Sequence, residues 1–155
     1  MIASEGHAKD GSAPPPDDRW IPVENGGSFT HHCGEFYWRP AKEHEQGQAR
    51  FGFRVAPHQC NTRPMAHGGL LAMAADVFMA RGALMMEGVA TPLPTISLSI
   101  DYLAPAPLGA WIEAEVVVTR TTRALAFVRL MLFAGDAPLL QANAVFRHSG
   151  SRQQA

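Results

Sequence analysis

Residues 68–86 read GGLLAMAADVFMARGALMM, and this stretch decides the fold that we predict for the chain. Apolar side chains recur in it at helical spacing, and only Asp76 and Arg81 carry a charge. A helix that is apolar nearly all round has to be buried nearly all round. One sheet covers one side of it, so we predict a homodimer with the helix or its sheet at the interface. The alternative cover is the N-terminal tail or the loop at 86–94, although such loops rarely form a core.

Strand-like runs lie on both sides of this helix in the sequence. In the run at 49–56, Phe51, Phe53 and Val55 alternate with other residues at a period of two, which is typical of a strand. The runs are 34–39, 49–56, 95–102, 112–119, 124–134 and 140–147. The short connections between the last four predict an antiparallel meander. One long helix and about six strands in one sheet predict an α+β fold.

Length and composition suit one globular domain. The chain has 155 residues, of which 46% are hydrophobic and 17% charged, so it can fill a core. We expect a flexible tail over residues 1–18, a single domain over 19–149 and a C-terminal tail over 150–155. The formal net charge of −1 argues against nucleic-acid and membrane-surface partners.

Cys33 and Cys60 are too few for a disulfide framework, and we expect reduced thiols in a cytoplasmic protein, with a single bridge as the alternative. The N-terminus has no apolar core, so we expect no signal peptide. The runs at 31–33 and 58–60 contain His and Cys but lack the paired spacing of a zinc site. With no P-loop or dinucleotide fingerprint present, we predict neither a metal nor a cofactor.

Asp76 is the first candidate for chemistry. It lies in the middle of the predicted helix among apolar neighbours, where an ionised carboxylate is costly unless it is paired, hydrogen-bonded or next to a wet cleft. Such a residue is either a functional acid or base or half of a structural ion pair. Arg81, five positions on, is not a normal helical partner. The local pattern alone leaves both interpretations open.

The run His67-Gly68-Gly69 at the start of the helix is the second candidate. Glycines let a ligand or another backbone come close, and the first N–H groups of a helix have no internal partner. With the helix dipole, that end suits an oxyanion developing on a carbonyl, and the alternative is a tight turn. Asn61, in the preceding loop, is a third candidate, with an Asx turn as its alternative.

The stretch from Asn61 to Asp76 resembles the active-site segment of hotdog-fold acyl-CoA thioesterases, most of all the phenylacetate-degradation type in the 4-hydroxybenzoyl-CoA thioesterase-like superfamily. That pattern has an Asn six residues before a His-Gly-Gly and an Asp nine residues after the His, and the chain keeps these spacings. Residues 95–105 resemble the strand that follows the helix in the family. Pro64 stands where the family commonly has Gly, so the loop geometry is expected to differ.

The resemblance implies a hotdog fold, an antiparallel sheet wrapped around one long central helix, in homodimers that often pair into homotetramers. It also implies hydrolysis of acyl-CoA to free acid and CoA at a site between subunits. Carried over, the Gly68 N–H binds the thioester oxygen and Asp76 of the partner subunit is nucleophile or general base. Asn61 orients the thioester or the water, and His67 shapes the loop.

The same resemblance suggests substrate contacts. Thr95 matches a position where the family can place a hydroxyl near the attacking water, and Gly69 lies beside the oxyanion donor. Leu71 and Met73 are expected to line the acyl pocket, and their bulk suits aryl or medium-chain acyl groups. Surface arginines are candidates for the phosphates of CoA: Arg120, Arg123 and Arg147.

Three other functions remain open at this point. The first is a non-catalytic hotdog module that binds acyl groups or CoA, which would need no acid. The second is a hotdog hydratase or dehydratase, which usually has an Asp and His pair on a different motif. The third is a purely structural oligomer.

Overall fold

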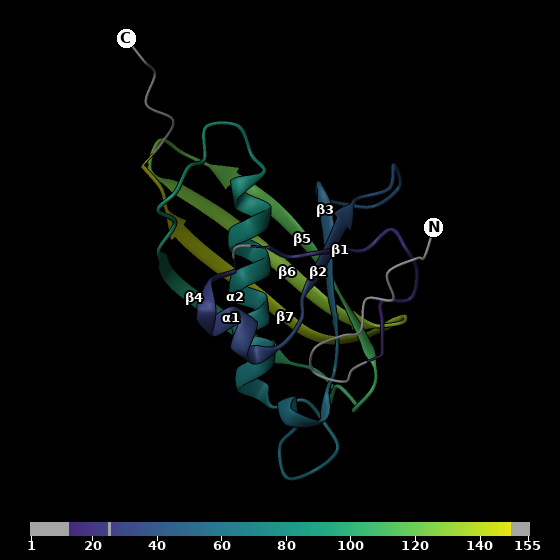
Figure 1. Ribbon diagram of the computed structural model, residues 1–155. Coiled ribbons are helices and arrows are strands. Elements are labelled where there is room, and N and C mark those ends of the chain that lie inside the picture. Colours follow the sequence, from purple (N-terminus) through teal and green to yellow (C-terminus); the bar gives the residue numbers. More distant parts are fainter. Residues whose placement is uncertain (1–12, 25, 150–155) are drawn as a thin grey trace.

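One curved antiparallel sheet wraps around a long helix in the computed structural model, which describes residues 13–24 and 26–149 (Figure 1). The helix, α2, spans Gly68–Leu84. The strands are β1 Ile21–Pro22, β2 Tyr37–Pro40, β3 Ala49–Arg54, β4 Thr95–Tyr102, β5 Trp111–Thr121, β6 Leu125–Ala134 and β7 Ala137–Arg147. This architecture confirms the predicted α+β class. The two-residue β1 adds a seventh strand that the sequence pattern did not indicate.

The strand order differs from the predicted meander. The sheet runs β1-β2-β3-β5-β6-β7-β4, so β4 pairs with β7 and not with the next strand in sequence, β5. A short connection limits only the distance between strand ends: residues 103–110 span the roughly 14 Å of three strand spacings with length to spare. As a result, β4 lies at one edge of the sheet and β1 at the other.

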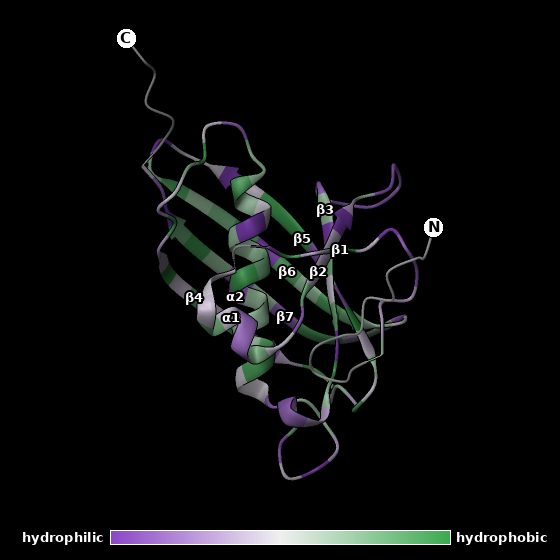
Figure 2. Ribbon diagram, in the orientation of Figure 1, coloured by the Kyte–Doolittle hydropathy of each residue, from purple (hydrophilic) through white to green (hydrophobic). Residues whose placement is uncertain are grey.

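Helix α2 packs its buried side chains against the concave face of the sheet. Phe78 is 0% exposed and stacks on Phe51 of β3 with the ring centroids 5.1 Å apart. Gly82 allows the helix to approach β5 closely, because a Cβ there would lie 2.6 Å from Cγ1 of Val116. Figure 2 shows apolar colouring along most of α2 and along the strands beneath it. In the described part of the chain, neither helix is long and apolar enough to cross a bilayer.

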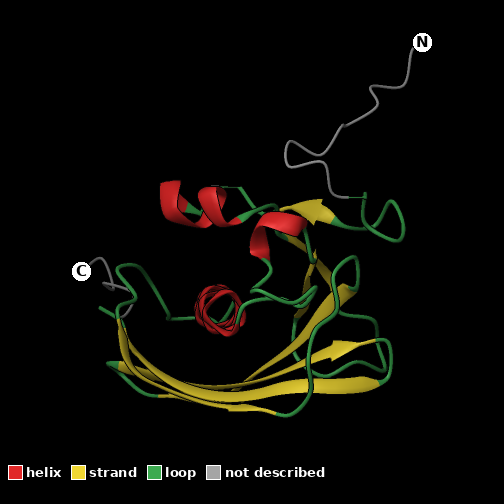
Figure 3. Cartoon of the chain, turned by 90° about the horizontal axis from the view of Figure 1, so that it is seen from below, coloured by secondary structure: helices red, strands yellow, loops and turns green. Residues whose placement is uncertain are grey.

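A segment that we did not expect covers part of the other side of α2 (Figure 3). It holds the short helix α1, Gly27–Cys33, and Phe36, whose ring meets that of Phe78 edge-on at 5.8 Å. The chain therefore covers part of this side of the helix itself, with a segment that neither the predicted second subunit nor its alternatives included. The cover is neither the tail nor the 86–94 loop. Helix α1 is too short for the sequence pattern to predict it. The prediction of a homodimer now depends on other surfaces.

The two tails of the predicted domain organisation lie mostly outside the described residues, which leave out 1–12 and 150–155. The described part of the N-terminal stretch contacts the domain. The Arg54 guanidinium donates hydrogen bonds to the carbonyl oxygens of Ala13 and Pro14, at 3.1 and 2.9 Å.

Charged side chains hold the hairpin between β2 and β3. Arg39, which is 5% exposed, donates to both carboxylate oxygens of Glu45, at 2.7 and 2.8 Å. Arg50 of β3 donates to Glu115 of β5 at 2.9 Å. The hydrogen bonds from Arg39 lower the pKa of Glu45 to about 2, so this carboxylate stays ionised in acid.

We expect this ion pair to make stability pH-dependent between about 4.5, the ordinary pKa of the Glu45 carboxyl, and about 2. A lowered folded-state pKa gives stability that is full above the unfolded pKa and is lost as pH falls through the folded one. Between pH 6 and pH 3 the advantage of wild type over Glu45→Gln in free energy of unfolding should shrink by about 2 kcal/mol. Urea unfolding at both pH values measures it. Glu43→Gln, at an exposed position, is the control, and an equal loss in both variants would contradict the prediction.

Candidate active site

Asp76 lies midway along α2, half-buried, with its carboxylate toward the start of β4. Its Oδ1 accepts a hydrogen bond from Oγ1 of Thr95 at 2.7 Å. Among the described residues, no Lys, Arg or His nitrogen lies within 4.0 Å of this carboxylate. Asp76 is therefore not half of an ion pair in the described structure. A partly desolvated carboxylate with one hydroxyl donor can still accept a proton or attack a carbon.

The start of α2 leaves one backbone donor available. His67 caps the helix: its Nδ1 accepts from the N–H of Gly69 at 2.9 Å, which assigns the ring proton to Nε2. The N–H groups of Leu70 and Leu71 donate to the His67 carbonyl, at 3.0 and 3.3 Å. The N–H of Gly68 donates to no described residue. It therefore remains free to bind an oxygen atom of a ligand at the positive end of the helix dipole.

Tyr102, at the end of β4, is a part of this region that the sequence analysis did not identify. Its hydroxyl donates to the Gly68 carbonyl at 2.8 Å, and the residue is 54% exposed. A Cβ on Gly68 would lie 3.5 Å from three atoms of the Tyr102 side chain. Strand β4 thus touches both groups of interest, Asp76 through Thr95 at its start and Gly68 through Tyr102 at its end. A tyrosine at a strand end has no distinctive sequence signal.

Asn61 occupies the Asx turn that was its alternative interpretation. Its Oδ1 accepts from the N–H of Arg63 at 2.8 Å, and its own N–H donates to the Met65 carbonyl at 2.9 Å. The side chain is exposed and forms no hydrogen bond to Gly68 or Asp76 in the described structure. The carbonyl of Pro64 accepts a hydrogen bond from the N–H of Leu108. Pro64, which replaces the Gly common in the family, therefore lies in a part of the loop that a backbone hydrogen bond holds in place.

The predicted acyl-pocket residues are split between core and surface. Leu71 is 3% exposed and packs in the core, whereas Met73 is half-buried on the same side of α2 as Asp76. Gly69 is exposed, and a Cβ there would lie 3.0 Å from Nδ1 of His67. Met73 and Gly69 are thus accessible in one chain, and the lining role of all these residues stays a prediction.

One chain does not bring the two key groups to the same reacting atom. Gly68 and Asp76 are eight residues apart on one helix, which is about 12 Å along its axis. A carbonyl oxygen bound to the Gly68 N–H lies about 3 Å from that nitrogen, and its carbon is then out of reach of the same chain's Asp76. The placement of the second group on a partner subunit therefore stays a prediction.

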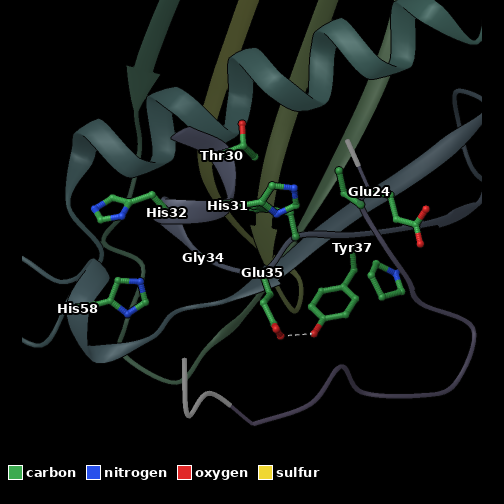
Figure 4. A pocket seen from close by; sticks show the side chains of 11 residues that line it. Glu24, Thr30, His31, His32, Gly34, Glu35, Tyr37 and His58 are labelled. Carbon is green, nitrogen blue, oxygen red and sulfur yellow. Dashed lines mark hydrogen bonds between the residues drawn. The ribbon is translucent and has the colours of Figure 1, made fainter. Parts of the chain in front are cut away.

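A cavity of about 760 Å³ lies away from this region, between α1, the residues before β2 and His58 (Figure 4). His31, His32 and His58 line it, and the hydroxyl of Tyr37 donates to Glu35 at 2.8 Å. In the described ranges, 13–24 and 26–149, no three His, Cys, Asp or Glu residues are arranged to hold a metal ion. None of the predicted site residues lines this cavity, so the candidate active site lies elsewhere.

Comparisons with known proteins show which family the chain resembles. Residues 64–140 match the model of the family described as the Thioesterase superfamily. A Pseudomonas aeruginosa protein named as a candidate esterase is 29% identical over 113 residues, which cover 73% of this chain and 82% of that protein.

Solved structures show the fold. A Streptococcus mutans protein bound to acetyl-CoA has a TM-score of 0.63 at 19% identity, covering 74% of this chain and 90% of that one. A thioesterase-type protein of Streptococcus pneumoniae with coenzyme A has a TM-score of 0.64 at 18% identity, covering 75% and 91%. Zebrafish thioesterase superfamily member 2 has a TM-score of 0.62 at 20% identity, covering 73% and 80%. The predicted hotdog fold is confirmed.

Proposed function

We propose that this protein, whose residues 64–140 match the Thioesterase superfamily, hydrolyses acyl-CoA thioesters with aryl or medium-chain acyl groups. The observation that carries the proposal is Asp76, a half-buried carboxylate without a described ionic partner, held by Thr95. The family match supports thioester hydrolysis in general. The CoA class is supported by likeness to structures that hold acetyl-CoA and coenzyme A.

In the proposed mechanism, the thioester oxygen accepts a hydrogen bond from the Gly68 N–H of one subunit. Asp76 of the partner subunit takes a proton from water as the water attacks the carbonyl carbon. The tetrahedral oxyanion then stays on the Gly68 N–H until it collapses and expels the CoA thiolate, which takes the proton from Asp76 and so restores the carboxylate. In the alternative route the carboxylate itself attacks, and water hydrolyses the mixed anhydride. Both routes keep Asn61 as the residue that orients the thioester or the water.

The free edge of β4 is where we place the second copy. β4 pairs with β7 on one side and with no described strand on the other, and its Ile96 is 59% exposed. Two β4 strands that pair antiparallel set the start of one strand beside the end of the other. Thr95 with Asp76 then comes close to Tyr102 and Gly68 of the partner subunit, which completes the site twice per dimer.

The nucleotide of CoA has a candidate site close to this edge. Arg123 and Arg147 line a cavity of about 420 Å³ together with Pro94, the residue before Thr95. No described carboxylate lies within 4.0 Å of either guanidinium group. A guanidinium group without a carboxylate partner can bind phosphate, because two of its N–H groups donate in parallel to two phosphate oxygens.

Arg123→Ala and Arg147→Ala should each raise KM for acyl-CoA about tenfold, because each removes a charge-assisted hydrogen bond to phosphate. The kcat/KM for the matching N-acetylcysteamine thioester, which has no nucleotide, should stay within about twofold. Steady-state thiol release on both substrates measures the difference. Arg129→Gln, an exposed side chain outside this cavity, is the control. An equal loss on both thioesters would contradict a nucleotide site.

The experiment that tests the function is thiol release from a panel of acetyl-, hexanoyl-, benzoyl-, phenylacetyl- and palmitoyl-CoA. We expect turnover with the aryl and medium-chain thioesters. CoA binding without thiol release would favour the non-catalytic module, and hydration of an enoyl-CoA would favour the hydratase. The expected location is the cytoplasm, where Cys33 and Cys60, which form no disulfide with each other, stay reduced.

A further inference from the structure

A second hollow of about 480 Å³ lies at the C-terminal end of α2, on the side of the sheet edge formed by β1. Its walls are mainly apolar: Ile21 and Pro22 from β1, Trp38 from β2, Phe51 from β3, and Leu84 and Met85 from the end of α2. Two charged residues, Glu24 and Arg81, complete the lining. Apolar hollows of this size bind small molecules when a few polar groups converge on them. The hollow is therefore a candidate ligand site outside the region of Asp76.

Arg81 supplies the polar group. Its Nη2 donates to the backbone carbonyl of Glu24 at 2.7 Å, and its side chain lines the hollow. No described carboxylate, including that of Glu24, lies within 4.0 Å of the guanidinium. Burial lowers the pKa of Arg81, which shows a cation partly removed from water without a compensating anion. Only one of its five N–H donors has a described acceptor. The other donors can bind a planar anionic group such as a carboxylate.

This hollow is separate from the proposed catalytic site. Arg81 follows Asp76 by five residues, which turns its side chain by about 140° around the helix axis. Asp76 bonds to β4, whereas Arg81 bonds to the segment after β1, and these strands form opposite edges of the sheet. A ligand at Arg81 therefore leaves the β4 edge and the Gly68 N–H accessible.

We propose that this hollow binds an apolar monocarboxylate, with the carboxylate on the Arg81 guanidinium and the hydrocarbon body against the apolar walls. The unbonded N–H donors of Arg81 select the carboxylate, and the walls select a medium-length chain or an aromatic ring. The acid released by the proposed hydrolysis belongs to this chemical class. The binding site does not depend on that reaction, because it uses none of the residues assigned to it.

Isothermal titration calorimetry of the full chain with octanoate, and with octan-1-ol as the uncharged match, tests the proposal. We expect wild type to bind octanoate at least about tenfold more tightly than octanol, and Arg81→Gln to lose that preference. Leu84→Trp, which fills the hollow from a partly exposed position, should lose both ligands. Asp76→Ala should bind octanoate as wild type does.

Three results would overturn the site. The first is unchanged octanoate affinity in both Arg81→Gln and Leu84→Trp. The second is loss of binding in Asp76→Ala, which would place octanoate in the acyl pocket of the catalytic site. The third is a change of oligomeric state in Arg81→Gln by light scattering with octanoate affinity intact, which would make the hollow a contact between copies. Circular dichroism and the unfolding midpoint confirm that each variant is folded, and thiol release reports the proposed reaction separately.

Discussion

Asp76→Ala and Asp76→Asn are expected to lower kcat for acyl-CoA hydrolysis by about 10³-fold or more, because neither variant can take the proton from water or attack the carbonyl carbon. The fold should persist. The carboxylate makes one described hydrogen bond, from Thr95, and its removal from a half-buried position leaves no described charge unpaired. Thiol release measures kcat, and urea unfolding measures the free energy of unfolding of the same samples.

Two further variants sharpen this test. Thr95→Val removes the hydroxyl that orients the carboxylate but keeps the acid, so we expect a smaller loss, about 10- to 100-fold. Asp136→Asn changes an exposed carboxylate at the β6–β7 turn and should leave kcat within about twofold. If Asp76→Ala hydrolyses the panel at the wild-type rate, the proposed mechanism fails, whatever Thr95→Val does.

Gly68→Pro is expected to lower kcat by about 10²- to 10³-fold, the usual effect of losing one oxyanion donor. Proline has no N–H, so the change removes the backbone donor that a side-chain substitution cannot reach. Gly68 is the first residue of α2, where proline is well tolerated, and His67 before it already has an extended conformation with φ −63° and ψ 136°. Gly68→Ala keeps the N–H, and its Cβ would make an ordinary contact with Tyr102. It should stay near wild type, so equal losses in the two variants would contradict the oxyanion role.

Mixing the two inactive variants tests whether the site lies between subunits. In a population of Asp76→Ala and Gly68→Pro chains, half of the random dimers are mixed, and each mixed dimer has one site with both groups intact. Co-refolding should therefore restore about a quarter of wild-type activity. No recovery, with mixed dimers present by mass spectrometry, would place both groups in one chain.

The sequence predicted those parts of the molecule that depend on local pattern. The apolar run at 68–86 identified α2, and a lone carboxylate among apolar neighbours singled out Asp76. The sequence predicts these features because each depends on residues that are only a few positions apart. The role of His67 as the helix cap was not predicted: the sequence indicated only that it shapes the loop, and His is not a preferred N-cap residue.

Long-range features were not accessible in this way. Tyr102 reaches Gly68 from 34 residues away, and no spacing rule connects the two. The pairing of β4 with β7 joins residues about 40 to 50 positions apart, which the local pattern of either strand does not encode. Helix α1 has only seven residues, too few to form a stable helix by their own propensity, and the segment that contains it packs against α2 through contacts such as that of Phe36 with Phe78.

The open edge of β4 has a consequence for the colloidal stability of the protein. The outward-facing N–H and C=O groups of this eight-residue strand pair with no described strand and are a template for indiscriminate strand addition unless a specific copy occupies them. In the arrangement proposed above, the occupant that prevents aggregation is also the one that brings the acid to the oxyanion donor. At a fixed protein concentration, a substitution that weakens the dimer should then lower turnover per chain and raise aggregation, so that colloidal stability and catalysis depend on the same dimerisation equilibrium.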